Sequence, residues 1–161
     1  PRKEEPTNIP CLVLPHVNGG SSKVLIYFHA NAEDIGLCYE MLDHIRQTVR
    51  INVLAPEYPG YGIYTKSKKM KEGQFEIDQE IETSSEQISA DAIIIYDFML
   101  ANCRRLTPKD VIIFGKSMGS GPAIHLASLR NPAALITMCP YTSIKDVVAN
   151  KVSFLSAFVA E

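Results

Sequence analysis

The stretch from Val111 to Leu129 constrains the fold more than any other part of the chain. The apolar, β-branched run Val111–Gly115 predicts a buried strand, and Met118–Leu129 predicts a helix. Between them stands Gly-Lys-Ser-Met-Gly at Gly115–Gly119, a Gly-x-Ser-x-Gly sequence at the turn from strand to helix. A strand, a glycine-bounded serine and a helix in that order are typical of an α/β fold.

The serine at this turn is a candidate nucleophile. In a nucleophile elbow the serine sits on a strained turn, and Gly115 and Gly119 remove Cβ atoms that would clash there. The turn would expose the Ser117 hydroxyl and place the backbone N–H of Met118 at a helix N-terminus, where it can stabilise an oxyanion. A tight turn in some other doubly wound domain remains the alternative.

Strands and helices alternate along the rest of the chain. This order predicts an α/β fold with a mainly parallel sheet and helices on both faces, as one domain over residues 1–161. The further strands are expected at Ile9–Leu14, Lys23–His29, Ile51–Ala55 and Ala134–Met138. The further helices are expected at Glu33–Val49, Ser85–Cys103 and from Ile144 onward.

The alternation breaks between Tyr64 and Thr83. Four lysines at positions 66–71 give way to five acidic residues at positions 72–82, with few apolar residues among them. Such a charge run is typical of a solvated surface insertion, and a lid or partner-binding loop is the functional alternative.

Composition excludes several classes of function. A net charge of −2 and the lack of a basic stripe argue against nucleic-acid binding, and no apolar run is long enough to span a bilayer. Cys11, Cys38, Cys103 and Cys139 lie far apart, without metal-ligand spacing. We expect buried free thiols in a reducing compartment, hence a cytoplasmic location or the cytoplasmic face of a membrane. Because the chain opens at Pro1, membrane association is expected only through segments outside this sequence.

A second turn complements the serine. Phe28–Gly36 follows the first long buried strand, and in this layout the loop after that strand donates the second oxyanion N–H. His29 leads into this loop, and we expect its ring nitrogens to hold the loop together rather than to act as the general base.

Four ordered motifs carry a family resemblance. They are His29–Gly36 (His-Ala-Asn-Ala-Glu-Asp-Ile-Gly), Tyr58–Gly62 (Tyr-Pro-Gly-Tyr-Gly), Gly115–Gly119, and Pro140–Ser143 (Pro-Tyr-Thr-Ser). In this order the chain resembles the Bem46-like group of α/β-hydrolase-domain proteins, including depalmitoylating members of the α/β-hydrolase-domain 17 kind. The resemblance covers nearly the whole chain from Lys23 onward.

The resemblance implies a serine hydrolase acting on an ester or thioester, with S-acylated protein as one substrate class and no cofactor or metal. It also implies that the backbone N–H groups of Asn31 and Met118 form the oxyanion hole. Two departures bear on this. Ala30 stands where the family usually has Gly, and the Tyr64–Thr83 segment is longer than in the depalmitoylating members.

The triad acid and base are not recognisable in the chain. In this fold they follow the nucleophile as Asp or Glu and then His. His125 would lie about 12 Å along the helix from Ser117, too far for proton transfer, and Asp146 is expected to cap a helix or face solvent. His16 and His44 precede the nucleophile and are not placed to serve.

Two explanations stay open. In the first, the sequence is cut from a longer enzyme whose later strand ends supply the acid and base, and an open apolar edge at Ala134–Met138 favours this explanation. Alternatively, the chain is a non-catalytic scaffold that associates with a partner.

The turn Tyr58–Gly62 carries a further expectation. It follows the strand Ile51–Ala55, which should neighbour Lys23–His29, so the turn should lie at the same sheet edge as Ser117. We therefore predict that Tyr58 and Tyr61 buttress the donor loop or line an acyl pocket, alongside His29 and Ala30.

Overall fold

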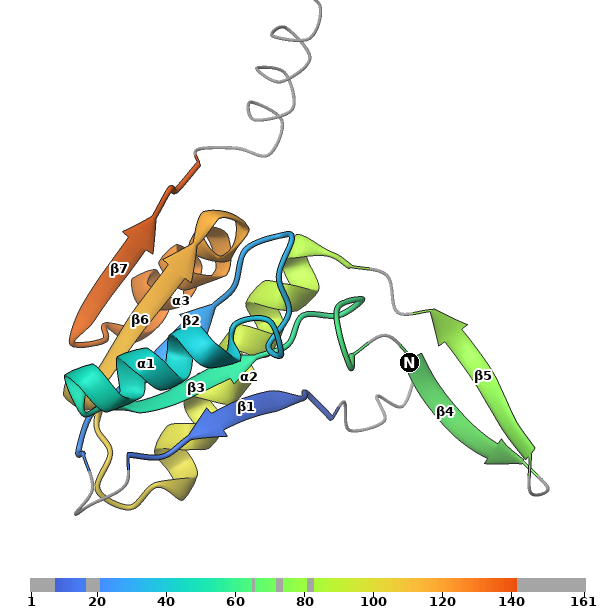
Figure 1. The fold of residues 1–161 in the computed structure, drawn as a ribbon, viewed down its shortest axis with the longest axis horizontal. Helices are drawn as coiled ribbons and strands as arrows, with labels where there is room; N and C mark the ends of the chain where they lie inside the picture. The colour runs from blue at the N-terminus through green and yellow to red at the C-terminus, as the bar shows by residue number, and fades with distance from the viewer. Residues whose placement is uncertain (1–7, 17–20, 65, 72–73, 81–82, 142–161) are drawn as a thin grey trace, which may run out of the picture.

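A five-stranded sheet forms the centre of the protein (Figure 1). The computed structural model describes residues 8–16, 21–64, 66–71, 74–80 and 83–141. The strands lie in the order β1-β3-β2-β6-β7. Their bounds are β1 Cys11–Leu14, β2 Val24–Phe28, β3 Asn52–Pro56, β6 Val111–Lys116 and β7 Ala134–Met138.

The sheet is mainly parallel, as the alternation of strands and helices predicted. β2 pairs in parallel with β3 on one side and with β6 on the other, and β6 pairs in parallel with β7. Only β1 runs antiparallel, against β3. The loops after β2, β3 and β6 therefore leave the sheet at one edge, and the candidate site is built there.

Helices cover both faces of the sheet (Figure 1). On one face α1 (Tyr39–Val49) buries Leu42 and Cys38 against Tyr27 and Val53. On the other face α2 (Ser85–Asn102) and α3 (Ser120–Arg130) share a core cluster with β2 and β6. This cluster includes the fully buried Ile26, Phe28, Tyr96, Ile113 and Leu126. Both strand faces are apolar because each is buried under a helical layer.

The helix predicted from Glu33 begins six residues later, at Tyr39. Residues 31–38 form turns instead, because Glu33 and Asp34 use their carboxylates locally: Glu33 accepts from Ala30 N and Asp34 accepts from Leu37 N. Glu33 and Asp34, whose acidic side chains are typical of a first helical turn, thus stabilise the loop that precedes the helix. The helix expected from Ile144 lies outside the described residues.

The predicted helix Ser85–Cys103 is α2, and its N-cap is Ser84. The Ser84 hydroxyl accepts a hydrogen bond from Gln87 N at 3.0 Å. The helix closes at Asn102 with Cys103 as its C-cap. The elbow helix begins with a short 3-10 turn, η2 (Ser117–Gly119), which precedes α3.

The charged segment forms a β-hairpin, which the sequence did not predict. β4 (Lys66–Lys71) and β5 (Gln74–Glu80) pair antiparallel as a separate two-stranded sheet, with a register shift between Ser67 and Lys68. In Figure 1 the hairpin extends away from the five-stranded sheet. Four lysines lie in β4 and three acidic residues in β5, a charged composition typical of a solvent-facing segment.

The four cysteines are free thiols. Cys38 is buried and Cys11 partly buried, but Cys103 and Cys139 are exposed, so the expectation that all four are buried was wrong. Both exposed cysteines follow the end of a helix or strand, where the chain leaves the core. Among the described helices, none is long and apolar enough to cross a membrane.

Candidate active site at the carboxyl edge of the sheet

Ser117 has the backbone geometry of a nucleophile elbow. It is one of four non-glycine residues in the described chain with positive φ, at 48°, and it is the first residue of η2, directly after β6. A left-handed conformation is costly for an L-residue and persists only where the surroundings impose it. Here the strand before and the helix after impose it, so the hydroxyl stands at the strand end.

Both elbow glycines are required by contact. A Cβ on Gly115 would lie 2.4 Å from the carbonyl oxygen of Gly119, and 2.7 Å from both Ala123 Cβ and Ser120 Cα. A Cβ on Gly119 would lie 2.1 Å from the Phe28 carbonyl oxygen. The elbow therefore packs against itself and against the start of the donor loop without room for a methyl group.

The donor loop is tied to the elbow by an ion pair. Lys116 Nζ contacts Glu33 Oε1, and Glu33 Oε2 accepts from the backbone N–H of Ala30 at 3.2 Å. Burial of the Glu33 carboxyl opposes its ionisation, but hydrogen bonds from Lys116 and Ala30 outweigh burial and lower its pKa. Lys116, which precedes Ser117, and Ala30, which precedes Asn31, thus both bind the carboxylate of Glu33.

Beneath the loop lies a fully buried pair. His29 Nε2 is 2.9 Å from Glu57 Oε1, and His29 Nδ1 is 2.9 Å from the Ala30 carbonyl oxygen. Neither side chain is accessible to solvent. Glu57 also accepts from Ile35 N and Tyr58 N, both at 3.2 Å. With both ring nitrogens engaged in the loop, His29 acts as a structural tie.

Tyr58 and Tyr61 lie against the donor loop. The Tyr58 ring stacks on His29 at 3.9 Å between centroids, and its hydroxyl donates to the His29 carbonyl oxygen at 2.9 Å. The Tyr61 hydroxyl contacts both Asn31 Oδ1 and, at 3.8 Å, Met118 Sδ. Tyr61 thus bridges the two residues whose backbone N–H groups are the oxyanion candidates, at the same edge as Ser117.

Burial keeps both tyrosines neutral. It raises the pKa of Tyr58 well above its usual value, and it raises the pKa of Tyr61 as well. The two hydroxyls therefore act as hydrogen-bond donors and not as proton acceptors near neutral pH. Ala30 follows His29 in the loop, where its backbone N–H and carbonyl are both used.

The described histidines other than His29 lie away from the elbow. His44 and His125 are exposed on α1 and α3, and the backbone of His16 bonds to the Asn52 side chain. Asp146 and Glu161 lie outside the described residues. No histidine or carboxylate of the described residues hydrogen-bonds to the Ser117 hydroxyl. The fourth motif is described only to Tyr141, whose hydroxyl donates to the Met118 carbonyl oxygen at 3.3 Å.

Sequence reasoning missed the two carboxylates that hold the loop. Glu57 follows an apolar strand and precedes the Tyr58–Gly62 turn, a position at the sheet's functional edge that could have marked it. The sequence pattern assigned Glu33 to the first turn of a helix. Its contact with Lys116 appears only in the folded structure. Among the described residues no cluster suited to a metal ion occurs.

Comparison with known proteins places this geometry in a class. No protein-family model matches the chain. It is 26% identical over 139 residues to a protein of Acanthamoeba polyphaga mimivirus whose name assigns it to the α/β hydrolases, covering 86% of this chain and 47% of that protein. It is 27% identical over 124 residues to α/β-hydrolase domain-containing protein 17C of Xenopus laevis, covering 77% of this chain and 35% of the relative.

Solved structures agree on the fold. The Francisella virulence factor BioJ matches with a TM-score of 0.57 at 15% identity, over 86% of this chain and 46% of that one. An esterase from Exiguobacterium antarcticum matches with a TM-score of 0.54 at 14% identity, over 83% of this chain and 42% of that one. The chain has the α/β-hydrolase fold. Its resemblance to α/β-hydrolase-domain proteins, protein 17C among them, is confirmed, and it spans less than half the length of these relatives.

Proposed function

We propose that the protein is a serine hydrolase that cleaves carboxylic esters or thioesters through an acyl-enzyme on Ser117. The observation that carries the proposal is the elbow itself, with Ser117 held at φ 48° on a glycine-lined turn against a second, rigid loop. The esterases among the fold's structural neighbours support ester chemistry, and the name of protein 17C supports a hydrolase.

In the proposed reaction the Ser117 oxygen attacks the acyl carbonyl carbon while a base takes the hydroxyl proton. Negative charge then develops on the carbonyl oxygen, and the N–H groups of Asn31 and Met118 stabilise it. Collapse releases the alcohol or thiol, which receives the proton from the base, and water attacks the acyl-enzyme in the same way to release the acid. The base and its orienting acid are proposed to lie outside residues 8–141.

The resemblance to depalmitoylating α/β-hydrolase-domain proteins implies an S-acylated protein as the substrate class. With such a substrate, the protein described here would act as a depalmitoylase in the cytoplasm or on the cytoplasmic face of a membrane. The Tyr64–Thr83 insertion is a place where substrate choice can differ from that of the depalmitoylating members, because its hairpin extends from the sheet in Figure 1.

Activity-based labelling tests the proposal. A fluorophosphonate probe phosphonylates an activated serine, so the protein with its natural termini should be labelled at Ser117 and the Ser117→Ala variant should not. Hydrolysis of p-nitrophenyl acetate and of a palmitoyl thioester should fall to background in the same variant. A folded protein that is neither labelled nor active would overturn the proposal.

The second candidate is a non-catalytic scaffold that acts by associating with a partner. The observation that favours it is the apolar surface on β7, where Leu135, Ile136 and Met138 are each exposed by 40% or more. Light scattering combined with the esterase assay separates the two. A monomer with rapid turnover excludes the scaffold, and a stable oligomer without turnover excludes the hydrolase.

A further inference from the structure

Two cavities meet on the face of the sheet that α2 covers. One, of about 700 Å³, lies at the amino ends of β2 and β3, across the sheet from Ser117. The other, of about 510 Å³, continues along β1 and α2. They share the lining residues Val13, Leu54, Met99 and Cys103, and we call the continuous hollow the α2 groove.

The length of the groove is apolar. Large apolar side chains along it remain exposed, with Val13 at 59%, Ile94 at 54% and Phe98 at 67%. Burial raises the pKa of the Cys11 thiol to about 11, so this lining group is also uncharged. From Ile94 to Asn102 the groove follows α2 for about 12 Å. Soluble proteins rarely expose large contiguous apolar surfaces, and those that occur often mark a binding site.

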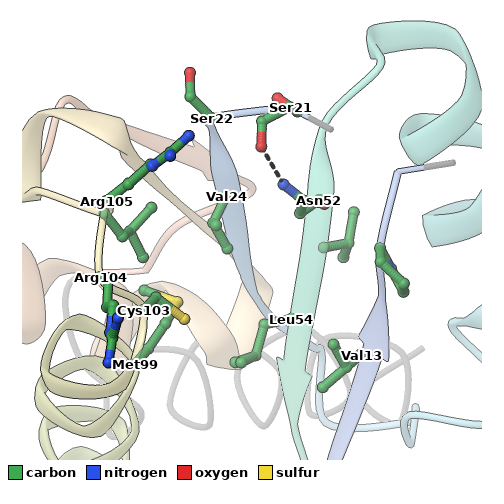
Figure 2. Close-up of a pocket in the computed structure, with 13 residues that line it drawn as sticks. Val13, Ser21, Ser22, Val24, Asn52, Leu54, Met99, Cys103, Arg104 and Arg105 are labelled. Atoms are coloured by element: carbon green, nitrogen blue, oxygen red, sulfur yellow. Dashed lines mark hydrogen bonds between the residues drawn. The ribbon is translucent and has the colours of Figure 1, made fainter. Parts of the chain in front are cut away.

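One end of the groove is basic. Arg104 and Arg105 line the first cavity, and within the described chain neither guanidinium pairs with a carboxylate. Figure 2 shows Arg105 reaching across this end toward Ser22, while Arg104 points along α2. Lys23, at the same sheet edge, is already held by Asp110 at 2.8 Å. Two unneutralised guanidinium groups thus flank the mouth of an apolar groove.

We propose that the α2 groove binds a free long-chain fatty carboxylate, with the head on Arg105, the positive charge of Arg104 near it, and the chain along Val13, Leu54 and Met99. A guanidinium fork matches a carboxylate in geometry and charge. The side-chain amides of Asn52 and Asn102 already donate to Ser21 O and Phe98 O, both at 2.8 Å, and the charged residues of the lining are Arg104 and Arg105. This site is independent of Ser117 and of the proposed hydrolase activity.

Titration calorimetry with dodecanoate tests the proposal on the protein with its natural termini. Dodecanoate should bind one-to-one, and dodecanol, which has the same chain without the charge, should bind at least about tenfold more weakly. The double variant Arg104→Gln/Arg105→Gln should weaken dodecanoate at least about tenfold and leave dodecanol unchanged. Phe98→Ser, at an exposed position, should weaken both ligands by several-fold.

Two controls isolate the groove. Lys109→Gln removes a neighbouring exposed charge and should change the dodecanoate Kd less than about twofold. Ser117→Ala should bind dodecanoate as the wild type does, which separates this site from an acyl site at the elbow. The proposal is overturned if the folded protein does not bind dodecanoate, including the case where another segment or a second copy covers the groove. It is equally overturned if the arginine variants bind dodecanoate unchanged.

Discussion

Replacing Gly119 by alanine tests the contact between the elbow and the donor loop. Gly119 has φ −64°, an ordinary helical value, so alanine meets no backbone penalty there. The obstacle is space, because the new Cβ would stand 2.1 Å from the Phe28 carbonyl oxygen and 2.8 Å from that of His29. Ordinary contact begins near 3.4 Å, so elbow and loop must separate by more than an ångström.

A displacement of this size moves the two oxyanion candidates apart. Misplacement of reacting groups by about 1 Å costs about 100-fold in rate, so kcat/KM for p-nitrophenyl acetate should fall by at least that factor. The free energy of unfolding should fall by about 1–3 kcal/mol, as for other overpacked core positions. Urea unfolding measures the second quantity and steady-state kinetics the first.

Gly121→Ala is the matched control, two residues along the same helix. Among the residues that the structure describes, its Cβ would meet only Tyr141 Oη, at 3.5 Å, which is an ordinary contact. Alanine favours the helix by about 1 kcal/mol over glycine, so this variant should be slightly more stable and keep full activity. If Gly119→Ala is as stable and as active as Gly121→Ala, the elbow does not press on the donor loop as described, and the reasoning fails.

Three further variants probe the residues around the loop. Glu57→Leu leaves buried His29 and two backbone N–H groups without their acceptor, so the free energy of unfolding in urea should fall by about 3–5 kcal/mol. A fall below about 1 kcal/mol would contradict a stabilising role for the buried His29–Glu57 pair. Tyr61→Phe removes the hydroxyl that contacts Asn31 and Met118, so kcat/KM should fall about fivefold with little change in stability. Unchanged kinetics would show that this hydroxyl does not contribute to catalysis. Burial raises the pKa of Asp91 above its ordinary 3.8, so the folded state loses stability as pH rises from that value through the raised pKa. Asp91→Asn should therefore gain unfolding free energy relative to wild type as pH rises from about 4, and a pH-independent difference would refute this.

The fold was largely predictable because its strands are buried on both faces. Continuous apolar runs such as Val24–Phe28 and Val111–Phe114 are typical of strands in a parallel sheet that is covered on both faces. The start of α1 was wrong because Glu33 and Asp34 suit both a helix start and a turn, and only tertiary partners decide between them. The hairpin was not predicted because β4 is rich in lysine, and the apolar alternation in β5, Phe75 and Ile77, is short and lies among acidic residues.

The candidate site was predictable where its chemistry is local. Ser117, Gly115 and Gly119 are adjacent in sequence, so the elbow could be recognised from one stretch. The position of Glu57 after a strand could have marked it, but the contacts of Glu57 and Glu33 could not be predicted, because their partners His29 and Lys116 are 28 and 83 residues away in the chain. A buried carboxylate leaves no periodic signature, and its role appears only when strand order brings β2, β3 and β6 together.

The two carboxylates explain why the donor loop can tolerate Ala30 in place of the family's glycine. Glu33 holds the Ala30 N–H from the side of Lys116, and His29 holds the Ala30 carbonyl from the side of Glu57. Each peptide group flanking Ala30 is therefore fixed by a side chain of the same loop, and that side chain is held in turn from another strand end, by Lys116 of β6 or by Glu57 after β3. A loop fixed in this way does not need the conformational freedom of glycine, since its shape is set by hydrogen bonds that a Cβ leaves intact. The same restraint keeps the Asn31 N–H pre-positioned, which is what an oxyanion site requires before substrate arrives.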